Sequence, residues 1–513
     1  MTAGRSSNQT GNPMRMLRPG LLGLLALSAA MPALAAPQND AATLIIALSG
    51  DVNTLDPHMT ASIGSDLSVA SHIYPALVLR GPDMKLRGDV ATEWAAVDDQ
   101  TWRFTLNPAA KFADGEKIDA AAVKWNMERV MDPAKKSRIA SWFAPIAEIN
   151  VIDPTTLEIR TKTPFPALPD QLSMFFLLPP DWAGTNDPAT TTTSGGPYMI
   201  AERVPGSSIT LKPNPDYWGE TPKFETVVFE VIPEDAARAA ALRAGEIDFA
   251  KGIALTEVKR LDAEPGVTAG AIPSSRMAFL KINTRKAPME NKAFRQALNY
   301  AVDKEAIAEV IFDGYTQPAN CQILTPDYSG YNPDLKPYPY DPDKAQELLK
   351  ASGVDLGQEI ELEVPTATYV QGSEAVQAIA SQLEEVGLKV RITEMSFGSF
   401  MDKQIKAKDL AQLAYLTYAW PTLDADGMLS LFTPGNAYDY WDSEPFGQIV
   451  AEGRSTTDPA KRTEIYKRAT ELMCEEAPIV FLFDQPVSYA VRDDLTWHAR
   501  GDDWVRAWDF DAK

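Results

Sequence analysis

The chain has 513 residues, with 48 Lys and Arg against 70 Asp and Glu, and a formal net charge of −22. Its 45% hydrophobic and 23% charged residues are typical of a folded globular protein and exclude a disordered or collagen-like chain. The acidic balance argues against a nucleic-acid-binding surface, because phosphate binding requires clustered Lys and Arg.

Residues 1–35 have the three parts of a secretory signal peptide. These parts are a basic start with Arg5, Arg15 and Arg18, an apolar stretch at 20–30, and a small-x-small cleavage site at 33–35. The apolar stretch is too short for a comfortable transmembrane helix. We therefore expect a periplasmic protein, and because no Cys follows the cleavage site we expect no lipoprotein anchor. The true start stays open between Met1, Met14 and Met16.

Strands and helices alternate along the rest of the chain. Hydrophobic periodicity and turn residues predict, in order, a strand at 42–49, a turn-rich loop at 51–57, a strand at 102–106, a helix at 119–131, strands at 156–161 and 208–212, a helix at 233–244, a strand from 247, a helix at 291–312, a helix from 341 to 353, a helix at 374–386, a strand at 389–393, a helix at 461–473 and a strand at 479–483. Helix, Gly cap and strand recur, which predicts an α/β fold with mixed sheets.

The usual catalytic and cofactor motifs are missing from the sequence. No G-x-S-x-G, G-x-G-x-x-G or P-loop occurs, and no H-E-x-x-H, C-x-x-C or H-x-H accompanies the three histidines. We therefore expect no catalytic residues, no metal site and no cofactor. His58, in Leu55-Asp56-Pro57-His58, is either a structural histidine or a base or ligand, and the structural role is the better interpretation.

Two cysteines, Cys321 and Cys474, stand 153 residues apart. In an exported chain they can form one disulfide. Two buried free thiols are the alternative that the sequence leaves open.

Six segments in order resemble one family. They are LDPH at 55–58, FADGEKIDAAAVKWNMERVMDP at 112–133, SGGPYMIAERVPGSSITLKPNPDYWG at 194–219, RAGEIDFA at 243–250, FLKINTRKAPMENKAFRQALNYAVDKEAI at 279–307 and YDPDKAQELLKASG at 340–353. Together they resemble the peptide, nickel and opine class, family 5, of the extracellular solute-binding proteins of ABC transporters. Most of these residues form turns and caps, so the resemblance rests on residues that build the fold.

The resemblance implies a periplasmic binding protein with two lobes, a hinge that joins them and a solute enclosed between them. Lobe I would comprise residues 36–270, with a small subdomain at about 82–187, and would be completed by 486–513; lobe II would comprise 271–485. The implied partners are a small peptide-like or opine-like solute and the transmembrane permease subunits of an ABC importer with its cytoplasmic ATPase. We expect a monomer that binds no nucleic acid.

The resemblance also implies where the solute lies. In lobe I the loop after LDPH would face the solute with Thr60, Ser62 and Ile63, together with Trp142. In lobe II the strand ends near 363–369, 395–400 and 415–426 would contribute Tyr369, Phe397, Tyr418 and Trp420. Tyr and Trp offer a flat apolar face and one polar group, and core packing is the alternative role for each of these aromatics.

The sequence departs from the peptide-binding pattern at two positions. Pro421 stands where such members have an Asp for the peptide amino group, and residues 365–369 contain no Arg for the carboxylate. Asp424 or Asp426 could replace the missing Asp, or could cap a helix near Gly427. An unpaired charge in a closed cleft costs several kcal/mol, so we expect an opine-like, modified or longer peptide solute, not a plain dipeptide.

Two other functions are left open by the sequence. One is a periplasmic hydrolase that acts on peptide-like substrates through two carboxylates. The other is a periplasmic receptor or chaperone that reuses the fold.

Overall fold

The computed structural model describes residues 42–60, 64–366, 368–502 and 504–513. The predicted signal peptide lies outside these residues. No helix in these ranges is long and apolar enough to cross a membrane.

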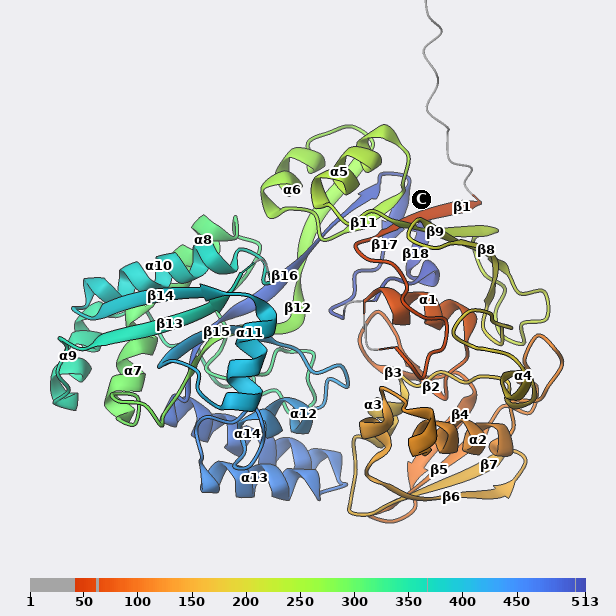
Figure 1. Cartoon of the computed structure of the whole chain (residues 1–513), viewed down its shortest axis with the longest axis horizontal. Coiled ribbons are helices and arrows are strands. Elements are labelled where there is room, and N and C mark those ends of the chain that lie inside the picture. The colour runs from red at the N-terminus through yellow and green to blue at the C-terminus, as the bar shows by residue number, and fades with distance from the viewer. Residues whose placement is uncertain (1–41, 61–63, 367, 503) are drawn as a thin grey trace, which may run out of the picture. The chain divides into compact units, whose positions relative to one another are not determined.

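Ten strands of the described residues form one mixed sheet (Figure 1). Their order across the sheet is β14 (Lys389–Met395), β13 (Glu359–Pro365), β15 (Leu413–Tyr418), β12 (Val267–Ile282), β16 (Ile479–Arg492), β11 (Phe249–Lys251), β1 (Thr43–Leu48), β10 (Thr226–Val231), β9 (Ser208–Pro213) and β8 (Tyr198–Val204). Neighbours are parallel around β13 and around β1 and antiparallel elsewhere. The α/β class with a mixed sheet is confirmed.

The two longest strands, β12 and β16, pair with each other and join the two halves of this sheet (Figure 1). Their register breaks between Pro273 and Met277, and Pro273 lies opposite Pro486. Proline donates no ladder hydrogen bond, so pairing is weakest there. The predicted lobe boundaries at 270/271 and 485/486 fall close to this break, and they stay a prediction.

Three smaller sheets accompany the large one. The four-stranded antiparallel sheet has the order β4 (Ala91–Ala96), β5 (Thr101–Leu106), β7 (Thr156–Thr161) and β6 (Ile146–Asp153); the two-stranded sheets are β2 (Val78–Arg80) with β3 (Leu86–Gly88) and β17 (Leu495–Trp497) with β18 (Phe510–Ala512). The four-stranded sheet lies within residues 82–187, where the sequence predicts a subdomain. It shares a hydrophobic core with the helix that carries Val123, Met127 and Val130.

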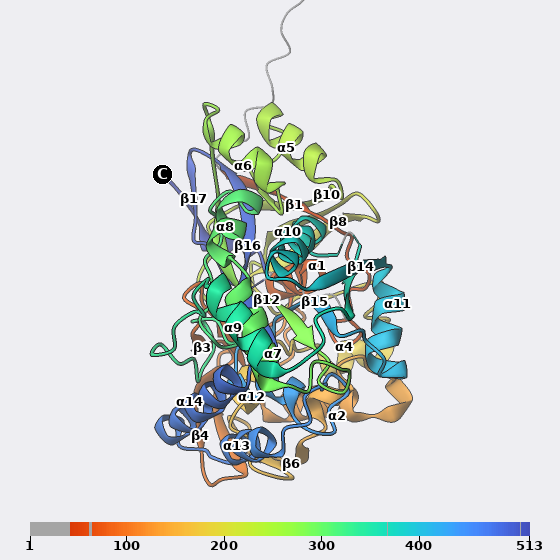
Figure 2. The ribbon, with the colours of Figure 1, turned by 90° about the vertical axis from the view of Figure 1, so that its left-hand side faces the viewer.

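Helices occupy much of the remaining described chain. The α-helices are α1 (Ser65–Ile73), α2 (Ala120–Met131), α3 (Leu168–Leu172), α4 (Pro180–Thr185), α5 (Asp235–Ala244), α6 (Leu255–Asp262), α7 (Lys292–Ala301), α8 (Lys304–Ile311), α9 (Pro342–Ser352), α10 (Gly372–Glu385), α11 (Phe397–Met401), α12 (Ala425–Leu429), α13 (Glu444–Arg454) and α14 (Pro459–Glu476). Short 3-10 or π turns are η1 (Pro133–Lys135), η2 (Ala140–Phe143), η3 (Asp402–Ala407), η4 (Ser430–Phe432) and η5 (Ala507–Asp509). Helices α7 and α9 lie side by side (Figure 2).

Helix α9 begins and ends where the sequence predicts. The Asp341 carboxylate accepts the backbone N–H of Lys344 at 2.8 Å, and Pro342 occupies the first helical position. Gly353 ends the helix at φ 68°, in the left-handed region that glycine adopts without strain.

The single helix predicted at 291–312 is wrong, because the structure has two helices there, α7 and α8. Val302 is extended (ψ 117°), and the Asp303 carboxylate accepts the N–H of Ala306 at 2.9 Å. An Asp that caps a new helix competes with helix continuation. The apolar face survives the break, since Phe294 and Ile307 are both buried.

The LDPH segment anchors the start of the fold to α2. The Asp56 carboxylate pairs with the Arg129 guanidinium at 2.6 Å and 3.2 Å. Arg129 also donates to Nδ1 of His58 at 2.8 Å, and Nε2 of His58 donates to the Phe176 carbonyl at 2.9 Å. Burial lowers the pKa of His58 to about 4. Both ring nitrogens are occupied, so the structural interpretation of His58 holds.

His72 ties α1 to the C-terminal segment. Its Nδ1 donates to the Ser68 carbonyl at 2.7 Å, and its Nε2 accepts the N–H of Ala507 at 2.9 Å. Protonation of Nε2 would abolish the second bond. Burial, assisted by the Arg506 charge, lowers the pKa of His72 to about 3.

This low pKa predicts a pH-dependent loss of stability. The folded pKa lies below the ordinary 6.5, so the contribution of His72 is complete above pH 6.5 and is lost as the pH falls towards 3. Between about pH 7.5 and 5 we expect it to fall by about 2 kcal/mol. Urea unfolding of His72→Gln should therefore lose about 2 kcal/mol less than the wild type over this interval. Equal losses in the two proteins would contradict the neutral histidine.

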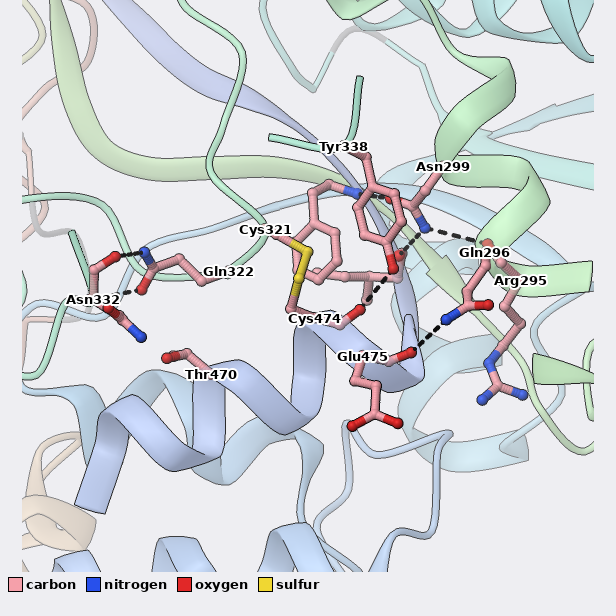
Figure 3. The surroundings of a disulfide bond; sticks show 12 residues. Arg295, Gln296, Asn299, Cys321, Gln322, Asn332, Tyr338, Thr470, Cys474 and Glu475 are labelled. Atoms are coloured by element: carbon pink, nitrogen blue, oxygen red, sulfur yellow. Dashed lines mark hydrogen bonds between the residues drawn. A yellow bond between two sulfur atoms is a disulfide. The ribbon is translucent and has the colours of Figure 1, made fainter. Parts of the chain in front are cut away.

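The structure contains the disulfide that the sequence left open. Cys321 and Cys474 are bonded, and their Cα atoms lie 5.1 Å apart (Figure 3). The bridge links the segment between α8 and α9 to the end of α14. Beside it, the Tyr338 hydroxyl donates to the Cys474 carbonyl at 2.8 Å, so the helix end is held covalently and by a hydrogen bond.

Candidate functional site

A small cavity of about 50 Å³ lies where five distant segments of the chain meet. Its lining residues are Arg80 from β2, Ser173 and Met174 after α3, Ser275 and Arg276 at the register break of β12, Ala419, Pro421 and Leu423 between β15 and α12, and Asp502, Trp504 and Arg506 near the C-terminus. The segments come from both sides of the predicted lobe boundaries. We call this space the inter-lobe cavity.

Arg80 crosses the wall of this cavity and contacts both sides. Its Nη1 donates to the Met84 carbonyl at 2.7 Å, and its Nη2 bonds to the Asp170 carboxylate at 2.5 Å and to the Thr422 carbonyl. Burial raises the pKa of Asp170 to about 6, against the opposing effect of Arg80. The Arg80 Nε is buried and has no hydrogen-bond partner among the described residues.

Arg506 is 1% exposed and lies close to two indole rings. The guanidinium carbon is 4.4 Å from the Trp504 ring centre and 5.5 Å from that of Trp508. Its Nη1 donates to the Arg80 carbonyl at 2.7 Å. Its Nε and Nη2 are buried without a partner in the described part of the chain.

Three carboxylates act electrostatically on Arg506: Asp89, Asp502 and Asp509. Asp89 accepts the N–H of Ala76 at 2.8 Å, and the other two bind another arginine. Arg500 takes both oxygens of Asp502, at 2.9 Å and 2.7 Å, and one oxygen of Asp509 at 3.3 Å. Burial and the neighbouring Arg500 lower the pKa of Arg506 to about 9, which leaves it charged at neutral pH.

Asp424, a predicted solute contact, is hydrogen-bonded to other groups of the protein. It is 2% exposed, and Arg462 binds both of its carboxylate oxygens, one of them at 2.7 Å. It also accepts the N–H of Asp426 at 2.9 Å and so caps α12. Of the two roles that the sequence left open for Asp424, the structure has the helix cap.

Tyr418 and Trp420 pack against the protein on the lobe II side. The Tyr418 hydroxyl bonds to Gln404 at 2.6 Å, and burial raises its pKa well above the ordinary value. The Trp420 indole covers Gly427, where an added Cβ would lie 2.0 Å from Cδ1. Neither ring lines the inter-lobe cavity, although Ala419 and Pro421 beside Trp420 do.

The structure places the other predicted contacts apart from one another. Thr60 is buried and donates to Asp66 at 2.5 Å, and Trp142 packs between two hydrophobic cores. Tyr369 is half-buried, 5.8 Å from the Tyr415 ring, and burial raises its pKa to about 12. Phe397 is 46% exposed at the start of α11. Ser62 and Ile63 lie outside the described residues.

The cavity arginines were missed by sequence reasoning. The alternation Trp504, Arg506, Trp508 is a signal that one short segment presents an arginine flanked by two aromatics. No spacing rule connects this segment with Arg80, more than 400 positions earlier, so only the fold brings the two together.

A second, larger cavity of about 290 Å³ lies within the lobe I side. Its lining includes Tyr74, Tyr198, Tyr217 and Trp508 with Asp89. No cluster of three or more His, Cys, Asp or Glu residues that could hold a metal ion occurs in the described ranges.

Comparison with known proteins decides the family. Residues 85–440 match the model of bacterial extracellular solute-binding proteins, family 5. The chain belongs to this family. The glutathione-binding protein GsiB of Shigella boydii is 29% identical over 496 residues, which cover 92% of this chain and 95% of the relative.

Solved structures show the same fold. The ABC transporter substrate-binding protein CtaP of Listeria monocytogenes has a TM-score of 0.80 at 22% identity, covering 89% of this chain and 95% of its own. The binding protein AgaA of A. tumefacien R10, in complex with agropinic acid, has a TM-score of 0.73 at 25% identity, covering 92% and 99%. The predicted two-lobed periplasmic binding protein fold is confirmed, and these relatives are binding proteins.

Proposed function

We propose that this protein is the solute-binding component of an ABC importer and that it captures a peptide-like or opine-like solute between its lobes. The family match over residues 85–440 carries the proposal. It is supported by the relatives named for glutathione binding and by the structural neighbour that holds agropinic acid. The solute would pass unchanged to the permease subunits in the membrane, which a cytoplasmic ATPase drives.

The inter-lobe cavity supports a position for the solute. It lies beside the register break of β12, where lobe I (36–270 and 486–513) would hinge on lobe II (271–485). In such hinge proteins the solute binds the closed state more tightly than the open one. Tyr369 and Phe397, at the ends of β13 and β14, remain proposed contacts for a solute that extends beyond the cavity.

We also propose that the protein is a monomer and that residues 1–35 direct it to the periplasm. The two alternative functions, a peptide hydrolase and a chaperone, have less support than transport, because no specific contact in the described structure favours either.

The test is to identify the natural solute. Purified protein should be denatured, and the released small molecules identified by mass spectrometry. The released compound, together with glutathione and trialanine as probes, should then be titrated into refolded protein by calorimetry. We expect one solute per chain and recovery of the solute unchanged after long incubation. Turnover of the solute, or no binding of any of these compounds, would contradict the proposal.

A further inference from the structure

We propose that the inter-lobe cavity is the subsite for an acidic group of the solute, a carboxylate, and that Arg506 selects for it. This inference rests on the proposed function and names the chemical class of its solute. The expected anchors of a dipeptide, an Asp near Pro421 and an Arg within 365–369, are missing. The proposed subsite uses arginines at other positions of the chain.

One edge of the Arg506 guanidinium has no hydrogen-bond partner among the described residues. Nη1 is taken by the Arg80 carbonyl, which leaves Nε and Nη2 without partners. The N–H groups of Nε and Nη2 point the same way along one edge of the planar guanidinium, and this edge binds a carboxylate through two parallel hydrogen bonds. The edge that a carboxylate fits is thus buried and without a partner among the described residues.

Because Arg506 is buried, its unpaired N–H groups lower the stability of the solute-free protein. Arg506 is 1% exposed, and a buried charged donor without an acceptor destabilises the folded protein more than a neutral one. Asp502 and Asp509 accept no hydrogen bond from Nε or Nη2, and Arg500 binds both carboxylates. A solute that brings its own negative charge removes the penalty, and a neutral solute does not.

The guanidinium of Arg80 lines the proposed subsite together with that of Arg506. The unpartnered Nε of Arg80 belongs to the residue whose carbonyl holds Arg506, and both side chains line the same space. Arg276 adds a third positive side chain to the lining. A volume of about 50 Å³ accepts a group the size of one or two water molecules, which suits a carboxylate and not a whole peptide.

The indole rings of Trp504 and Trp508 both lie close to the Arg506 guanidinium. Stacking of this kind restricts the guanidinium before the solute arrives, so less side-chain freedom is lost on binding. Lysine cannot reproduce the arrangement, because its ammonium is a point charge that makes no parallel pair of hydrogen bonds.

The experiment compares acids with their neutral derivatives. Glutathione with its diethyl ester, and trialanine with trialanine amide, are titrated into the wild type, Arg506→Gln, Arg506→Lys and the control Arg468→Gln. Arg468 lies on α14 in an exposed ion pair with Glu452 and outside the cavity lining. We expect the wild type and the control to prefer an acid over its neutral derivative by roughly 30-fold or more. Arg506→Gln should lose this preference, and Arg506→Lys should restore only part of it.

A stability readout separates a binding role from a structural one. Removal of an unpaired buried charge should leave the melting temperature of solute-free Arg506→Gln equal to or above that of the wild type. A sharp drop in melting temperature with the acid preference intact would show that Arg506 is structural and would overturn the subsite. Equal affinity of the wild type for acid and neutral forms would also overturn it while leaving the proposed function standing. Binding of neither the released compound nor any of the four probes would contradict both.

Discussion

Replacement of Cys321 and Cys474 by alanine is expected to lower the free energy of unfolding by about 4 to 5 kcal/mol. The bridge closes a loop of 153 residues. A cross-link of this span removes much of the conformational freedom of the unfolded chain, and the stabilisation grows with loop length. Urea unfolding of the wild type and of the double variant measures the difference.

Reductant supplies the control for this experiment. Wild-type protein unfolded in dithiothreitol should match the double variant, and the variant itself should not respond to dithiothreitol. A double variant within about 1 kcal/mol of the oxidised wild type would show that the bridge does not limit the unfolded chain.

Arg462→Met is expected to destabilise the protein by about 3 to 5 kcal/mol, because it leaves the buried Asp424 carboxylate without its partner. The same helix offers a matched control. Arg468→Gln removes an ion pair with Glu452 in which both side chains are 52% exposed, and such pairs contribute about 0 to 1 kcal/mol.

The double variant Arg462→Met with Asp424→Asn should recover part of the loss, since no unpaired charge remains. Thermal unfolding of the three variants and the wild type measures the effect. Equal destabilisation by Arg462→Met and Arg468→Gln would show that Asp424 does not depend on Arg462.

Local rules predicted much of the fold. Capping residues mark where α2 and α9 begin, because the Asp119 and Asp341 carboxylates accept the first free N–H groups of their helices. Asp303 caps α8 in the same way, which divides the single helix predicted at 291–312 into two. The long strand β12 escaped detection, since Gly270 and Pro273 interrupt its pattern and pairing with β15 and β16 stabilises it.

The site was predicted less well for a physical reason. The aromatics chosen along lobe II have apolar faces that suit a core as well as a solute, and Tyr418 and Trp420 pack within the protein. The cavity arginines became visible only as unsatisfied donors, and satisfaction depends on partners from distant segments such as those around Arg80 and Asp502. A sequence alone does not show which buried charges are paired.

Hydrogen exchange with and without the natural solute tests most directly whether the solute lies in the inter-lobe cavity. The account predicts slower exchange on both sides of that cavity at once, in lobe I peptides around Arg80, Met174 and Arg506 and in lobe II peptides around Ser275 and Pro421. Slower exchange on one side only, or only around the larger cavity near Tyr217, would contradict it.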